Sequence, residues 1–115
     1  MRAKIFAATA LAMLSMSPAT ASTVQNGYVT GFSTLGSNIT LVFTDGTRDT
    51  PPSCSNPGFP NRWAIDASTP QGQATLSILL TARALHEPVR FYGTGTCSVL
   101  GDSETISTLV TNNLM

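Results

Sequence analysis

The chain is short, weakly charged and poor in cysteine. It has 115 residues, of which 10% are charged and 42% are hydrophobic, with two Cys and a formal net charge of zero. This length supports one small domain, so two-domain arrangements are excluded.

The first 21 residues have the pattern of a secretory signal peptide. Positive charges at Arg2 and Lys4 precede an apolar run over residues 5–16, and a small-residue Ala-Thr-Ala sequence ends at Ala21. The apolar run is too short to cross a bilayer. We therefore expect cleavage after Ala21, a secreted or periplasmic location, and one mature domain over residues 22–115. The alternative is a retained N-terminal helix or membrane anchor.

Without these 21 residues the chain is mildly acidic and contains no Lys. The 94 remaining residues carry four Arg against six acidic side chains, a net charge of −2, and 25 of them are Ser or Thr. Such a surface releases few counterions from a phosphate backbone, so nucleic-acid binding and docking to anionic lipid are disfavoured. Abundant Thr and Ser favour exposed strand faces.

The two cysteines form an even pair in a chain predicted to be exported, which favours a disulfide between Cys54 and Cys97. Closing this 44-residue loop would remove roughly 4 kcal/mol of conformational freedom from the unfolded chain. A metal site would need more ligands than two thiols and the single His86 supply, so we expect neither a metal nor another cofactor.

The N-terminal third of the mature chain predicts two strands. The first covers residues 27–34, with Gly31 as a bulge or bend, and turn residues follow it. The second covers residues 38–44, where Ile39, Leu41 and Phe43 recur at period two and should face the core.

A long loop then precedes the third strand. Residues 47–61 are rich in Pro, Ser, Asn and Gly, and a loop of this length is typically functional or disordered. The third strand covers residues 62–66, and its Trp63 is predicted to anchor the core.

A helix and two further strands complete the expected order. Thr69 followed by Pro70 is a strong helix start, and Pro88 ends the helix after about Leu85. Strands are expected over residues 89–92 and 104–111. Three strands, one helix and two strands is the element order of an OB-type barrel, so we predict a β-rich α+β fold of this type. A small open α+β sheet is the alternative.

Three short motifs resemble catalytic or ligand-binding motifs, but their positions in the sequence favour structural roles. Residues 93–96, Gly-Thr-Gly-Thr, lack the helix and Lys of a phosphate loop. Residues 101–103, Gly-Asp-Ser, resemble a lipase motif, but no His follows them. His86 stands where the helix ends, a position that favours a cation. We therefore assign no catalytic residue and expect no enzyme, with a hydrolase as a distant alternative.

Three stretches carry a resemblance to a known family. Arg-Trp-Ala at residues 62–64, Leu-Leu-Thr-Ala at 79–82 and Pro-Val-Arg-Phe-Tyr at 88–92 resemble the binding (B) subunits of subtilase cytotoxin and typhoid toxin. The chain looks still more like small uncharacterised secreted bacterial proteins with a Tyr-Gly-Thr-Gly-Thr-Cys ending, here residues 92–97. The resemblance implies an OB-fold that assembles into a ring and binds host glycans. Where the toxin subunits have a sugar-contacting Ser, this chain has Asn26.

Two functions follow from these observations. The first is a non-catalytic binding module for carbohydrate or a protein partner, because sugars are held by aromatic faces and neutral hydrogen-bonding groups. Its candidate contacts are Asn26, Tyr28, Phe32 and Phe59. The second is a structural or assembly protein of the cell envelope that self-associates through exposed strand edges or an apolar patch.

Overall fold

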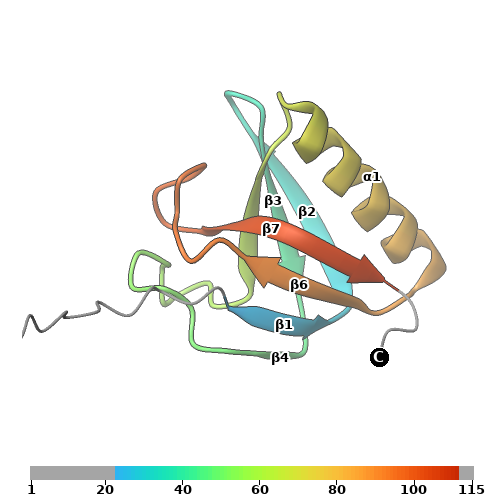
Figure 1. The fold of residues 1–115 in the computed structure, drawn as a ribbon, viewed down its shortest axis with the longest axis horizontal. Coiled ribbons are helices and arrows are strands. Elements are labelled where there is room, and N and C mark those ends of the chain that lie inside the picture. The colour runs from blue at the N-terminus through green and yellow to red at the C-terminus, as the bar shows by residue number, and fades with distance from the viewer. Residues whose placement is uncertain (1–22, 112–115) are drawn as a thin grey trace, which may run out of the picture.

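The computed structural model describes residues 23–111, which form a β-rich domain with one helix (Figure 1). The predicted signal peptide lies outside these residues. The elements in chain order are β1 (Val24–Gly27), β2 (Val29–Leu35), β3 (Ile39–Thr44), β4 (Thr47–Arg48), β5 (Arg62–Asp66), α1 (Pro70–Leu85), β6 (Val89–Gly93) and β7 (Glu104–Thr111).

The described part of the chain has seven strands, whereas the sequence predicted five. One extra strand is β1, which lies almost entirely before the first predicted strand, residues 27–34, and was not predicted. It is separated from β2 at Tyr28, whose backbone N–H donates to the Asp45 carboxylate over 2.7 Å. A side chain at Gly27 would place its Cβ 1.7 Å from the Asp45 carbonyl oxygen, so the close approach requires glycine. The other extra strand is the two-residue β4, which lies inside the predicted loop.

The strands form one curled sheet in the order β2-β3-β5-β7-β6-β1-β4. Neighbours are antiparallel except β5 and β7, which are parallel through the pairs of Trp63 with Glu104 and Ala64 with Thr105. Where a bulge or bend was predicted at Gly31, the pairing of β2 with β3 shifts register between Val29 and Gly31. Because β1 and β2 are consecutive in the chain but lie near opposite ends of this order, the sheet curls into a half-barrel (Figure 1).

Helix α1 begins and ends as the sequence predicted. The Thr69 hydroxyl accepts from the Gly72 N–H over 2.9 Å and caps the first turn. His86 ends the helix in the left-handed region, at φ 53°. The buried stripe of the helix consists of Gly72, Thr75, Leu79 and Ala82.

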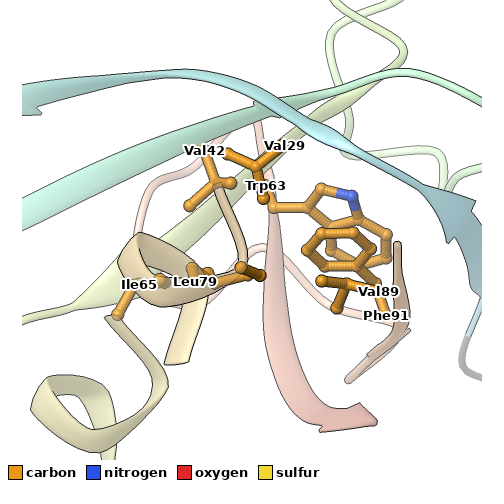
Figure 2. Close-up of a cluster of buried hydrophobic side chains, with 8 residues drawn as sticks. Val29, Val42, Trp63, Ile65, Leu79, Val89 and Phe91 are labelled. Atoms are coloured by element: carbon orange, nitrogen blue, oxygen red, sulfur yellow. The ribbon is translucent and has the colours of Figure 1, made fainter. Parts of the chain in front are cut away.

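The hydrophobic core lies between α1 and the inner face of the sheet. Trp63 is fully buried at its centre and stacks on Phe91, with ring centroids 5.6 Å apart, as Figure 2 shows. The predicted role of Trp63 as a core anchor is confirmed. The other core members are Val29, Val42, Ile65, Leu79, Ala82 and Val89.

Cys54 and Cys97 form the predicted disulfide. The bond connects the loop between β4 and β5 to the loop between β6 and β7. Backbone hydrogen bonding supports the same connection, because the Asn56 N–H donates to the Asp102 carbonyl over 2.9 Å. The long loop predicted from its proline content is therefore held at two points.

Candidate ligand-binding site

A buried polar network lies beside the aromatic core and fixes the strands beneath the candidate site. Gln25 on β1 is fully buried, and its Oε1 accepts from Trp63 Nε1 and from the Thr44 hydroxyl, each over 2.7 Å. Its Nε2 donates to Asn61 Oδ1 over 3.2 Å. A buried amide whose groups are paired in this way joins three strands and a loop without an unsatisfied polar group.

An ion pair adjoins this network. Arg48 Nη2 lies 2.8 Å from Glu104 Oε1, and both side chains are almost completely buried. The Arg48 guanidinium lies over the Trp63 ring, 3.8 Å from its centroid. Arg48 Nε has no hydrogen-bond partner within residues 23–111. Burial lowers the pKa of the Arg48 guanidinium from its ordinary value, and the hydrogen bond and charge of Glu104 oppose that effect.

The Gly-Thr-Gly-Thr motif serves this ion pair. The backbone N–H of Gly95 donates to Glu104 Oε2 over 2.8 Å. A Cβ at Gly93 would lie 1.9 Å from the same oxygen, so only glycine fits beside the carboxylate. Gly93 is therefore explained by the packing of Glu104, and Gly95 by its left-handed backbone, at φ 83°.

A surface pocket of about 260 Å³ opens above the network, and we call it the Phe59 pocket. Strands β2, β3 and β5 supply one side and the end of the proline-rich loop supplies the other. Its lining residues are Thr30, Phe43, Thr44, Gly58, Phe59, Pro60, Asn61 and Arg62.

Phe59 and Arg62 form the most distinctive part of this pocket. The Arg62 guanidinium lies over the Phe59 ring, 4.3 Å from its centroid, while Phe59 remains 47% exposed. Arg62 is held from the other side, because its Nε donates to Ser103 Oγ over 2.7 Å and its Nη2 lies 2.9 Å from Asp102 Oδ1. The ring therefore has a fixed cationic backing and an exposed surface.

Hydrogen bonds of the loop position Phe59. Its own N–H donates to the Asn56 carbonyl, and the N–H of Gly58 donates to Asn56 Oδ1 over 2.8 Å. Arg48 Nη1 also donates to the carbonyl of Pro60. The loop end that carries the aromatic ring is thus anchored to the buried ion pair.

The pocket also offers neutral polar groups. Thr30 is exposed and lines the pocket. Asn61 is half-buried, and its side-chain oxygen accepts from Gln25 Nε2. A hydroxyl and an amide beside an exposed aromatic ring suit a polyhydroxylated ligand.

A second hollow, of about 400 Å³, lies within the proline-rich loop. Its wall contains neither an aromatic nor a charged side chain. Its lining residues are Thr50, Pro51, Pro52, Ser53, Ser55, Asn56, Pro57 and Pro60. This hollow offers hydroxyl and amide groups but no aromatic surface for a sugar ring, so the Phe59 pocket is the stronger candidate.

The four residues predicted as ligand contacts lie in different environments. Phe59 lines the pocket, but Phe32 is partly buried and packs against the core. Tyr28 stacks on His86, with ring centroids 4.3 Å apart. Asn26 is exposed, and its Oδ1 accepts from Arg90 Nε over 2.8 Å. Thus Phe59 alone of the four lines the pocket.

Sequence reasoning did not identify Thr30, Phe43, Asn61 and Arg62 as possible contacts. Arg62 and Asn61 stand where the proline-rich loop enters β5, which is a position where a rigid strand presents loop residues. The junction between this loop and the predicted third strand could therefore have indicated Asn61 and Arg62 as candidate contacts. Thr30 and Phe43 reach the pocket only through the pairing of β2 with β3.

The Gly-Asp-Ser motif and His86, which the sequence also singled out, have structural roles. Asp102 and Ser103 belong to a turn and bind Arg62, and exposed His86 is the helix cap. In residues 23–111 no helix is long and apolar enough to cross a membrane. No group of three or more His, Cys, Asp or Glu in that range is arranged to hold a metal ion.

Comparison of the chain with protein-family models, curated proteins and solved structures finds no match in any of the three.

Proposed function

We propose that this protein is a secreted, non-catalytic module that binds carbohydrate in the Phe59 pocket. The observation that carries the proposal is the half-exposed Phe59 ring, backed by Arg62 and placed beside Thr30 and Asn61. Sugar rings pack their C–H faces on aromatic side chains and exchange hydrogen bonds with neutral polar groups.

The fold that we propose for this module is an OB-type barrel. If β1 and β2 are counted as one strand bent at Tyr28, and the short β4 is set aside, five strands remain. The helix then follows the third strand, and the sheet order begins and ends with parts of the first strand. Both features are typical of the OB-type barrel.

We further propose that the sugar site differs from that of the toxin binding subunits that the sequence resembles. Asn26 stands where those subunits have a sugar-contacting Ser, and its side-chain oxygen already accepts from Arg90. The exposed aromatic ring is on the loop before β5 instead. A role in a toxin assembly therefore receives no support from this position.

Export is part of the proposal. It rests on the predicted signal peptide and on the disulfide, because such bonds persist in oxidising compartments outside the cytoplasm. Mass spectrometry of the protein, expressed with its own N-terminus in a bacterial host, would test it. The expected mature mass begins at Ser22, and a protein retained with an intact N-terminus would contradict it.

The binding proposal is tested by screening the oxidised protein on a glycan array and then titrating the best glycan. Phe59→Ala should weaken binding by at least about tenfold, because it removes the stacking surface. Leu35→Ala is the matched control, since Leu35 is similarly exposed, at 43%, and lies outside the pocket lining. An array without hits, or equal binding by Phe59→Ala and the wild type, would overturn the proposal.

A further inference from the structure

The disulfide between Cys54 and Cys97 lies at the surface of the domain. Cys54 is exposed and Cys97 is half-buried. Neither belongs to the hydrophobic core around Trp63 and Phe91. Exposed disulfides are reduced more readily than buried ones. The bond is therefore open to attack by a thiol in solution.

The two loops that the bond joins build the Phe59 pocket together. The loop before β5, residues 49–61, carries Phe59. The loop before β7, residues 94–103, carries Asp102 and Ser103, which hold the Arg62 guanidinium over the Phe59 ring. The aromatic surface and its cationic backing therefore depend on the relative position of these two loops.

The noncovalent contacts between the two loops are accessible to water. The Asn56 N–H donates to the Asp102 carbonyl over 2.9 Å, and Asn56 Nδ2 lies 3.5 Å from Asp102 Oδ2. The Asp102 side chain, which also binds Arg62, is 47% exposed. Solvent screens such contacts and competes for their hydrogen bonds, so they hold the loops weakly once the covalent bond is cut.

The interior of the domain is held by contacts that involve neither cysteine. The Arg48–Glu104 ion pair is almost completely buried, and Gln25 accepts from Trp63 in the buried polar network. These contacts connect the strands directly. Reduction of the bond should therefore loosen the two loops and leave the sheet and its core in place.

We propose that the Cys54–Cys97 bond is a redox switch for the Phe59 pocket. The pocket is formed in the oxidised protein and is lost when a low-molecular-weight thiol reduces the bond. This inference rests on the proposed function, because it concerns the same pocket. A chain made in a reducing compartment would acquire its binding surface only after export to an oxidising one.

The reduction is ordinary thiol–disulfide exchange. A thiolate of the small thiol attacks Sγ of Cys54, so that a mixed disulfide forms and Cys97 leaves as a thiolate. A second thiolate attacks the sulfur of the small thiol in that mixed disulfide and releases the Cys54 thiolate. Both cysteine thiolates can then take up protons. Two electrons pass to the protein, and two molecules of the small thiol become one disulfide.

The first test is a glycan titration of the protein in buffers of oxidised and of reduced glutathione. Reduction should raise the dissociation constant at least about tenfold, and oxidised glutathione should restore it. The double variant Cys54→Ser/Cys97→Ser is the control for direct effects of the thiol. It should bind as weakly as the reduced wild type in both buffers.

The second test needs no glycan and measures hydrogen exchange of backbone amides by NMR. Reduction should speed the exchange of the Asn56 amide at least about tenfold, because its partner Asp102 lies on the other loop. Amides of β3, which is paired on both sides, should keep their rates.

The outcomes separate the switch from the proposed function. If the oxidised protein binds no glycan, the proposed function fails, and the exchange of the Asn56 amide alone decides whether the bond controls the loops. An unchanged rate at Asn56 would overturn the switch, as would equal glycan affinity in the two buffers. Unfolding of the whole domain on reduction, followed by the fluorescence of Trp63, would also overturn it, since the bond would then support the entire fold.

Discussion

Two arginines of this protein make the same pair of contacts in different surroundings. Arg48 lies 2.8 Å from a Glu104 oxygen and over the Trp63 ring, and its side chain is 3% exposed. Arg62 lies 2.9 Å from an Asp102 oxygen and over the Phe59 ring. Glu104 is fully buried, whereas the Asp102 side chain is 47% exposed.

Burial decides what each arrangement does. The Arg48 pair is enclosed by Trp63, Gly93 and Gly95, so it holds β4, β7 and the adjoining loop together. The Arg62 pair fixes the back of an aromatic ring whose remaining surface faces solvent. The same guanidinium chemistry therefore stabilises the interior in one place and builds a candidate binding surface in the other.

The largest expected effect comes from breaking the interior pair. Glu104→Ala should reduce the free energy of unfolding by about 3–5 kcal/mol, because it leaves the Arg48 charge buried without a partner. Urea unfolding followed by the fluorescence of Trp63, the only Trp in the sequence, measures the change. A loss below about 1 kcal/mol would mean that Arg48 is hydrated or finds another partner.

Removing the disulfide should have an effect of similar or slightly smaller size. The double variant Cys54→Ser/Cys97→Ser frees a 44-residue loop and should reduce the free energy of unfolding by roughly 4 kcal/mol. The bond joins the loops on either side of Arg62, so we expect the Trp63 emission of the folded variant to match that of the wild type. A changed emission would show that the interior pair also depends on the bond.

The pair of the buried Arg62 with the half-exposed Asp102 should contribute much less to stability. Asp102→Asn should change the free energy of unfolding by only about 0.2–1 kcal/mol, because solvent screens a pair whose acid is half exposed. The same urea titration compares it directly with Glu104→Ala. A loss as large as that of the interior variant would remove the distinction between the two arginines.

The smallest effect on stability is expected at Asp66, whose carboxylate is hydrogen-bonded by Ser68. The side chain and the N–H of Ser68 hydrogen-bond Asp66 and lower the pKa of that carboxyl from its ordinary 3.8. Its stabilising contribution is therefore present above pH 3.8 and is lost as the pH falls through the lower folded value. As the pH is lowered from 5 to 2, the melting temperature of the wild type should fall slightly more steeply than that of Asp66→Asn. Parallel curves would contradict this assignment.

Local features of the fold were predictable because their causes lie within a few residues. The cap at Thr69 and the proline after it set the start of α1, and residues 62–66 and 104–111 became β5 and β7 as expected. The disulfide was predictable from an even pair of cysteines. Strand β1 was not predicted, because it pairs with β6, more than 60 residues later in the chain.

The candidate site shows the limit of sequence reasoning more sharply. Phe59 was identified as an aromatic residue in a polar loop, but its backing by Arg62 depends on Asp102 and Ser103, about 40 residues later. Asn26, Tyr28 and Phe32 were chosen by residue type, and the structure pairs them with Arg90, His86 and the core, respectively.

The sequence by itself determined the β-rich class, the helix and its ends, the disulfide and the burial of Trp63. Those outcomes follow from capping, periodicity, cysteine count and side-chain volume, which act locally or do not depend on a particular partner. The tertiary structure alone decided that Glu104 meets Arg48 and that Phe59 meets Arg62. Strand pairing brings such residues together across long stretches of chain, and burial then decides which ion pair stabilises the interior and which one forms a surface.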